Sequence, residues 1–391
     1  MSAERVFQVL LCSGLLAGGW LYGHYWQKAA LPSEASGSGE LRSENAELTR
    51  DLDQLRDELA QVRSLLSKGS LAIPEDLIAF VEKDSGMVFT KAPLAKLAAP
   101  DVLRNAAERN LDLLFGKGGV EKEEQAWTSL GLLPANTKLR GQWIAIETLG
   151  VRGLFDLTSG EILLSEDFDP MSISDSGALV HQLARQLQLQ NHPLPFSWKS
   201  ADEARAWQAV HRGAAAGVEA RYMRRSAAAE EIEWDDKGDD REALLLQLSP
   251  TMQGLANFPY FEGNNFAKKA YLDSRAVYLS IFKKPPTTTF GVLHPEMPPR
   301  EKERTHSSQI GALGILLLFD PYLGNEAAEE IAHSWVDDAY EIQATTLTWR
   351  ITLETPEIAR TFVEGLQRIE SKGRSINIDG THVEVTVPFQ K

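Results

Sequence analysis

The feature that most constrains this chain is an uninterrupted apolar run near its start. Val6 to Trp26 is 21 residues long and contains no Asp, Glu, Lys or Arg. A helix needs about 20 apolar residues to span a bilayer. The end of the run carries aromatic residues of the kind found at membrane interfaces: Trp20, Tyr22, Tyr25 and Trp26. We therefore expect residues 1–26 to form an N-terminal anchor that crosses the membrane through residues 6–26. A cleaved signal peptide is the alternative, although its apolar core usually has only ~7–15 residues.

The residues after the apolar run predict a linker and then a coiled coil. Residues 27–40 contain the Ser-, Gly- and Pro-rich stretch of a flexible linker. Residues 41–69 carry a stripe with alternating spacings of four and three: Leu41, Asn45, Leu48, Leu52, Leu55, Leu59, Val62 and Leu66. With Asn45 at an a position, the g–e' pairs of two parallel strands are complementary: Asp51 with Arg56, and Glu58 with Arg63. We expect a parallel homodimer through residues 41–69. One amphipathic helix packed on its own domain is the alternative.

Charge and cysteine content exclude two classes of protein. The 391 residues carry a formal net charge of -15 and no concentrated block of Lys and Arg, so a nucleic-acid partner is not expected. A single cysteine, Cys12, lies in the apolar run, which leaves no intrachain disulfide.

Residues 70–391 predict a helix-rich α+β domain with short β-hairpins. Helical patterns come first, in "PEDLIAFVEKD" and "APDVLRNAAERNLDLLFG". The apolar stretches "QWIAIETLGVRGLFDL" and "GEILLSEDF" meet at the turn signal Thr158-Ser159-Gly160 and predict a hairpin. Near the end, "TTLTWRITLE" predicts a strand, Thr355 and Pro356 predict the start of a helix, and Asp379-Gly380 predicts a second hairpin.

The stretch "ALVHQLARQLQLQNHP", residues 178–193, predicts a helix with His181 and Arg185 on one face. Ser174, Asp175 or Ser176 would cap its start. A zinc peptidase helix has the pattern H-E-x-x-H at this spacing.

Several segments together resemble a family of exported bacterial zinc metallopeptidases of the gluzincin type. That family's helix has the pattern V-H-E-L-x-H-A-L-Q-D-Q, against V-H-Q-L-A-R-Q-L-Q-L-Q from Val180 here. The other similar segments are "SLGLLP", "VRGLFDLTSGEILLS", "PPTTTFGVLHPE", "AAEEIAHSWVDDAYEI" and "LTWRITLETPEIARTFVEGL". The resemblance covers roughly residues 75–391 in order. It implies a metallopeptidase-like α+β domain.

The departures from the family pattern fall on its chemistry. Zinc hydrolysis needs three protein ligands and a base beside the first His. The resemblance places His181 at the first ligand, but Gln182 at the base and Arg185 at the second ligand. Arg212, in "AVHRGAAAGVEARYM", stands where the third ligand, a Glu, is usual. These four positions are degenerate, so we expect no catalytic residue, no metal and no cofactor.

Other uses of the helix stay open at this point. His192, His211 and Glu219 are the residues from which a metal site would have to be rebuilt. Arg185 and Arg212 would converge in the former cleft and bind an anion there, or pair with acids of the chain, for which Asp156 and Glu219 are candidates. His181 would otherwise be a structural residue of the core or cleft wall.

The sequence thus predicts a single-pass protein of the bacterial inner membrane with most of the chain in the periplasm or outside. Its expected role is binding or scaffolding in the cell envelope, with a protein or peptide ligand that the sequence does not name. A hydrolase with a rebuilt active site and a purely structural coiled-coil envelope protein are the alternatives.

Overall fold

The computed structural model describes residues 71–195, 197–230, 240–298, 308–369 and 373–389. The predicted anchor, linker and coiled coil lie outside these residues. By contacts the chain divides into two units, Met1–Pro74 with Leu94–Leu97, and Glu75–Pro93 with Ala98–Lys391. In the first unit Leu71 forms an antiparallel bridge with Ala95, the first residue of β1 (Ala95–Ala98). The second unit carries the fold described below.

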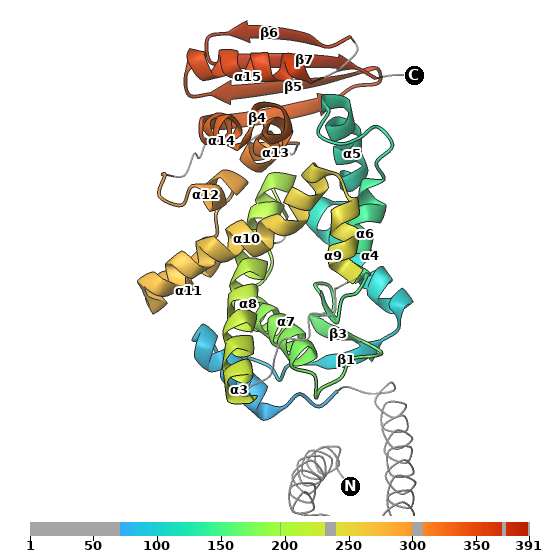
Figure 1. The fold of residues 1–391 in the computed structure, drawn as a ribbon, viewed down its shortest axis with the longest axis vertical. Helices are drawn as coiled ribbons and strands as arrows, with labels where there is room; N and C mark the ends of the chain where they lie inside the picture. Colours follow the sequence, from blue (N-terminus) through green and yellow to red (C-terminus); the bar gives the residue numbers. More distant parts are fainter. Residues whose placement is uncertain (1–70, 196, 231–239, 299–307, 370–372, 390–391) are drawn as a thin grey trace, which may run out of the picture. The chain divides into compact units, whose positions relative to one another are not determined.

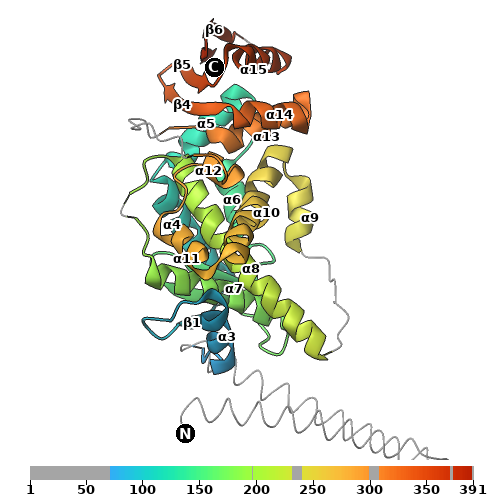
Figure 2. The same ribbon diagram turned by 90° about the vertical axis from the view of Figure 1, so that its left-hand side faces the viewer.

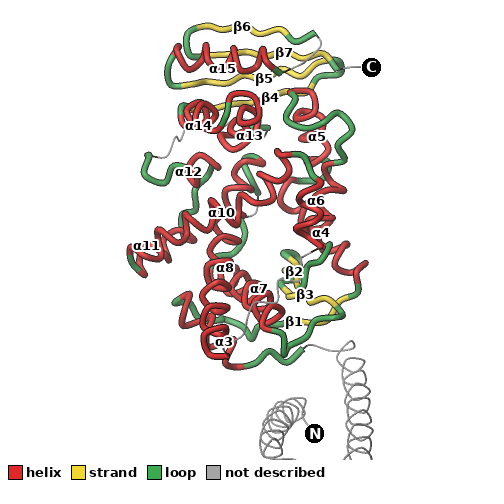
Figure 3. The backbone as a smooth tube through the Cα atoms, in the orientation of Figure 1, coloured by secondary structure: helices red, strands yellow, loops and turns green. Residues whose placement is uncertain are grey.

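The described residues form an α+β structure with 59% helix and 14% strand (Figure 3), so the predicted fold class is confirmed at this level. Three helices form the centre of the second unit: α7 (Ile173–Asn191), α8 (Ala201–Glu230) and α10 (Pro250–Asp273). The other helices before the C-terminal region are α3 (Glu75–Ser85), α4 (Pro100–Phe115), α5 (Gly119–Leu130), α6 (Leu139–Thr148), α9 (Asp240–Gln247), α11 (Arg275–Lys283) and α12 (Thr289–Leu293). None of the described helices is both long and apolar enough to cross a membrane.

Helices α8 and α10 cross at backbone contact. A Cβ atom added to Gly213 would lie 2.1 Å from the carbonyl carbon of Gly263, and one added to Gly263 would lie 2.1 Å from the carbonyl oxygen of Ala209. Only glycine fits at such a distance, because any side chain would collide with main-chain atoms. The glycine after Arg212 is therefore a packing requirement of this crossing.

The predicted first hairpin is present and packs against α7. Strand β2 (Gly153–Asp156) pairs antiparallel with β3 (Glu161–Ser165), in the register Asp156 to Glu161. The Asp156 carboxylate accepts the amide of Thr158 at 2.9 Å, which shapes the turn. The apolar stretch before it divides differently from the sequence prediction, because residues 139–148 form α6.

A four-stranded antiparallel sheet with the order β4-β5-β7-β6 forms the C-terminal layer (Figure 1). Its strands are β4 (Trp335–Ile342), β5 (Thr346–Leu353), β6 (Ser375–Asp379) and β7 (His382–Pro388). The predicted strand and second hairpin are thus confirmed. Helices α13 (Gly311–Leu323), α14 (Asn325–His333) and α15 (Pro356–Arg368) lie next to this sheet (Figure 2).

An aromatic cluster and a buried carboxylate join this sheet to its helices. Phe362 of α15 packs on Trp349 of β5 and on Phe319 of α13, with ring centroids 5.4 and 5.0 Å apart. The Asp338 carboxylate, buried in β4, accepts four N–H groups at 2.7–3.0 Å, from the amides of Ile310 and Gly311 and from the indoles of Trp335 and Trp349.

The start of α15 follows the sequence prediction. Thr355 is the N-cap and accepts the amide of Ile358, and Pro356 occupies the first helical position.

Candidate functional site

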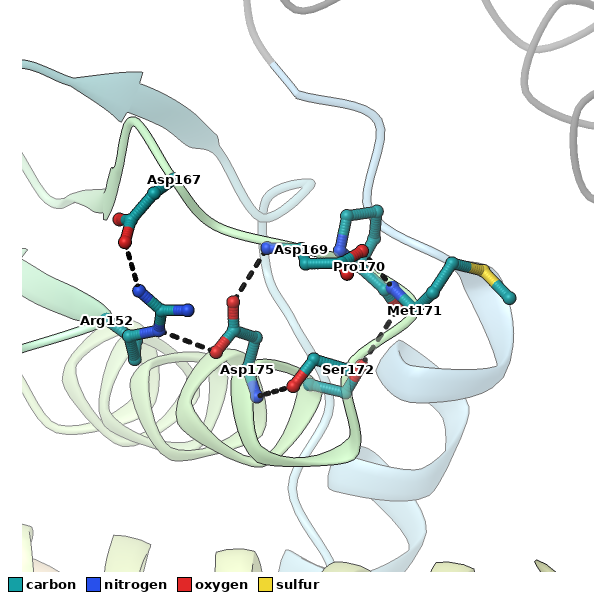
Figure 4. Close-up of polar contacts among 8 residues, drawn as sticks. Arg152, Asp167, Asp169, Pro170, Met171, Ser172 and Asp175 are labelled. Atoms are coloured by element: carbon teal, nitrogen blue, oxygen red, sulfur yellow. Dashed lines mark hydrogen bonds and ion pairs between the residues drawn. The ribbon is translucent and has the colours of Figure 1, made fainter. Parts of the chain in front are cut away.

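Helix α7 begins earlier than the capping residues predicted. Ser172 is the N-cap and accepts the amide of Asp175, so Ser174, Asp175 and Ser176 do not cap the helix. The Asp175 carboxylate, almost fully buried, instead accepts Nε of Arg152 and the amide of Asp169, both at 2.7 Å (Figure 4). These bonds join the start of α7 to the residues on either side of the first hairpin. They therefore help to position the following turns of α7, which carry His181 and Arg185.

His181 lies two turns into α7 and is 5% exposed. Its Nδ1 is 2.9 Å from Oε2 of Glu219, which α8 contributes. The Tyr260 ring of α10 lies 6.1 Å from the imidazole, centroid to centroid. A carboxylate on Nδ1 orients the ring of a histidine and selects the tautomer with the proton on that atom.

Gln182 makes a structural hydrogen bond. Its Nε2 donates to the carbonyl oxygen of Gly153 at 2.9 Å, so the helix is fastened to β2. A glutamate at this position would direct a carboxylate at a carbonyl oxygen, since it has no N–H to donate. The glutamine is therefore the residue that suits this contact.

Arg185 is a buried cation whose hydrogen-bond acceptor is a neutral amide. It is 4% exposed, and its Nη1 donates to Oε1 of Gln182 at 3.3 Å. Its guanidinium carbon lies 5.7 Å from the centre of the Phe155 ring. Nε is buried and has no hydrogen-bond partner among the described residues. Burial, followed by the nearby charge of Arg212, lowers the pKa of Arg185 to about 10, so the side chain is still protonated at neutral pH.

Arg212 is paired inside the protein. Its Nη1 and Nη2 lie 2.6 and 2.9 Å from the two carboxylate oxygens of Glu147, at the end of α6. Burial alone would lower the pKa of Arg212, but the charge of Glu147 and hydrogen bonds to Glu147 and Tyr260 outweigh it and raise the pKa.

The internal ion pair that the sequence suggested thus exists, but neither predicted acid forms it. Asp156 binds Nη2 of Arg109 at 2.7 Å, and Glu219 binds His181. Asp156 and Glu219 are near in sequence to the helices that carry Arg185 and Arg212, whereas Glu147 comes from a third helix, α6.

The four candidate site residues of the sequence analysis line one cavity of about 220 Å³. His181, Gln182, Arg185 and Arg212 all line it, together with Glu147 and Glu219. Helices α6, α7, α8 and α10 and strand β2 contribute residues to the walls. Arg185 and Arg212 therefore line one cavity.

Of the residues considered for a rebuilt metal site, Glu219 lines this cavity, but His192 and His211 do not. His211 is buried against Trp207, with ring centroids 4.1 Å apart, and its Nδ1 contacts Oε1 of Gln188 at 3.2 Å. His192 stacks on Phe282 instead. Within the described ranges, no group of three or more His, Cys, Asp or Glu side chains is placed to hold a metal ion. The walls of the 220 Å³ cavity do not suit a Zn²⁺ ion, because the guanidinium groups of Arg185 and Arg212 line it and repel a cation.

A second buried ion pair, between Arg205 and Glu123, lies close to Arg212. A cavity of about 30 Å³ shares Ile146, Glu147 and Arg212 with the larger one and is otherwise mostly apolar. Arg205, seven residues before Arg212 on α8, borders it and binds Oε2 of Glu123 at 2.5 Å.

Sequence reasoning missed Glu147 and Arg205. Glu147 is a lone acid in the apolar stretch "QWIAIETLG", and such a charge is usually paired when the stretch is buried. The spacing of seven between the two arginines, which places them on one helix face, was a second available signal.

Comparison of the chain with protein-family models, with curated proteins and with solved structures finds no match. The role of the cavity therefore has to be argued from its own residues.

Proposed function

We propose that this chain is a membrane-anchored, exported protein of the metallopeptidase type that lacks zinc chemistry and uses its α7–α8 cavity for binding. Its role in the bacterial envelope is binding or scaffolding. One observation carries the proposal: Arg185 and Arg212 line the cavity that Gln182 and His181 also line. Cations at the ligand positions repel Zn²⁺, and the amide of Gln182 cannot accept a proton from water as a carboxylate does.

The position of the chain in the cell is part of the same proposal. Residues 6–26 would anchor it in the inner membrane, with the rest of the chain in the periplasm or outside. Residues 41–69 would pair two copies in parallel, which would place two cavities side by side on one membrane surface.

Zinc content of the full chain, purified in detergent, tests the loss of zinc chemistry. We expect no stoichiometric zinc after dialysis, and no difference between the unmodified chain and His181→Ala. His382→Ala, at an exposed position of β7, is the matched control. Stoichiometric zinc that disappears in His181→Ala and not in His382→Ala would refute the proposal.

A hydrolase without zinc is the second candidate, since the contact between Glu219 and His181 is the arrangement that orients a general base. Hydrolysis of peptide or ester substrates by the same preparation, lost in His181→Ala, would favour it over a binding role. Absence of turnover together with specific ligand binding would favour the binding role.

A purely structural coiled-coil protein remains the third class. Light scattering of the full chain in detergent, against a chain with Leu48 and Leu55 replaced by Glu, tests the dimer. A parallel dimer that becomes a monomer is the expected result, and a monomer in both chains would contradict it.

A further inference from the structure

Each charged side chain that lines the 220 Å³ cavity contacts an ionisable partner, with one exception among the described residues. Arg152, which lines it, is bound by the carboxylates of Asp167 and Asp175 at 2.5 and 2.7 Å (Figure 4). Both oxygens of Glu147 are engaged by Arg212. Glu219 contacts His181. Arg185 is the exception.

Arg185 has no carboxylate within ion-pair distance in the part of the chain that the structure describes. Its one acceptor there is the neutral amide oxygen of Gln182, at 3.3 Å. Phe155 covers one side of the guanidinium, at 5.7 Å from the ring centre. An uncompensated buried charge is strongly unfavourable, so this side chain, nearly fully buried at a cavity wall, is suited to an anion that comes from outside.

We propose that Arg185 binds the carboxylate of a small ligand in this cavity, either a short organic acid or the C-terminal residue of a peptide. The inference rests on the proposed function, because it names the ligand class of the same cavity. The planar guanidinium matches a carboxylate with two parallel N–H donors.

The carboxylates of the wall disfavour a doubly charged anion. Arg185 presents one cation to one carboxylate, whereas a dianion such as phosphate would place a second negative charge close to Glu147 and Glu219, which line the same space. Carboxylate is thus a better match than phosphate.

The volume limits the rest of the ligand. About 220 Å³ is smaller than the ~300–1,000 Å³ of sites for drug-sized molecules. The space therefore accommodates one terminal residue, with His181 and Tyr260 as polar neighbours on the wall.

Binding of matched acids and amides to the full chain in detergent tests this assignment by calorimetry. The probes are propionate, N-acetylalanine, trialanine, the amides of all three, and inorganic phosphate. We expect each amide to bind at least about tenfold more weakly than its acid. Trialanine that binds more tightly than N-acetylalanine and propionate identifies a peptide C-terminus as the source, and equal affinities identify a short acid.

Two variants connect the effect to Arg185. Arg185→Gln should weaken binding of the acids at least about tenfold and leave the weak binding of the amides unchanged. Arg185→Lys should retain part of the affinity, because lysine keeps the positive charge but lacks the two parallel N–H donors of the guanidinium. Arg104→Gln, an exposed arginine of α4, is the control and should bind as the unmodified chain does.

Equal binding of acids and amides, no measurable binding of any acid at millimolar concentration, or tighter binding of phosphate than of the acids would each overturn the inference. The comparison of acid with amide needs no variant, so it stands even if Arg185→Gln does not fold. Failure here is distinct from failure of the proposed function. Ligands that bind without a carboxylate leave a binding role intact, whereas stoichiometric zinc or hydrolysis refutes that role itself.

Discussion

Arg212 and Glu147 form a two-point ion pair inside the protein, with Nη1 2.6 Å from Oε1 and Nη2 2.9 Å from Oε2. Their side chains are only 10% and 12% exposed. The pair joins α8 to the end of α6 and borders both the 220 Å³ and the 30 Å³ cavity. The pair therefore connects two helices through a direct bond between two buried side chains.

Glu147→Gln should destabilise the protein by about 3–5 kcal/mol, because it leaves Arg212 buried without a compensating charge. Urea denaturation followed by circular dichroism measures the change. Glu108→Gln, which removes an exposed pair with Arg104, is the control and should cost less than about 1 kcal/mol. Equal effects of the two substitutions would show that the buried pair contributes no more than a surface pair.

The replacement of both partners by apolar residues should be less harmful than the loss of one. In Glu147→Leu with Arg212→Met no charge remains buried, and such exchanges are often close to neutral. The free energy of unfolding of the double variant should therefore exceed that of Glu147→Gln. A double variant less stable than Glu147→Gln would contradict this account of the pair.

Gly213→Ala should destabilise the protein by about 1–3 kcal/mol, because its methyl group would meet the backbone of Gly263 at the α8–α10 crossing. Gly141→Ala is the matched control in α6, where the nearest atom to a new Cβ is 3.9 Å away. Alanine there should stabilise the helix by about 0.5–1 kcal/mol. Thermal unfolding of both variants should shift in opposite directions. An unfolding temperature of Gly213→Ala that is unchanged or raised would show that α8 and α10 can separate without cost.

Acid should destabilise the fold through His211. Burial, followed by the charges of Arg185 and His192, lowers the pKa of His211 from 6.5 to about 3. Between these values the unfolded chain binds the proton and the folded chain does not. The contribution of a neutral His211 is therefore fully present above pH 6.5 and is lost as the pH falls toward 3, by up to about 1.4 kcal/mol per pH unit.

His211→Leu removes this titration, so its free energy of unfolding should fall less steeply between pH 6.5 and 4.5 than that of the unmodified chain. His382→Ala, at an exposed position, should keep the original slope. Equal slopes for His211→Leu and the unmodified chain would mean that His211 takes up its proton without unfolding.

Two hairpin turns and the cap of α15 could be predicted because each depends on a few neighbouring residues, whereas the predicted cap of α7 was wrong. Thr158-Ser159-Gly160 and Asp379-Gly380 mark their hairpins, and Thr355 caps its helix, through local backbone geometry alone. Helix α6 could not be separated from the strand that follows it, because a short apolar stretch has no clear period.

The partners in the site could not be predicted, since they come from distant parts of the chain. The sequence correctly indicated that Arg185 and Arg212 share one cavity and that an acid lies beside them. The acids that it suggested, Asp156 and Glu219, are near α7 and α8 in sequence. Their carboxylates bind Arg109 and His181 instead. Glu147 is 65 positions from Arg212, and only the packing of α6 brings the two together.

The four N–H groups that donate to the Asp338 carboxylate should also slow local opening of the C-terminal region. The start of α13 and the indoles of β4 and β5 all donate to one buried carboxylate. Separation of α13 from the sheet would leave that carboxylate without two of its donors, so partial opening is costly. The helix and the sheet should therefore open as a single cooperative unit, and the amide protons of Ile310 and Gly311 should exchange with solvent as slowly as those in the middle of β5.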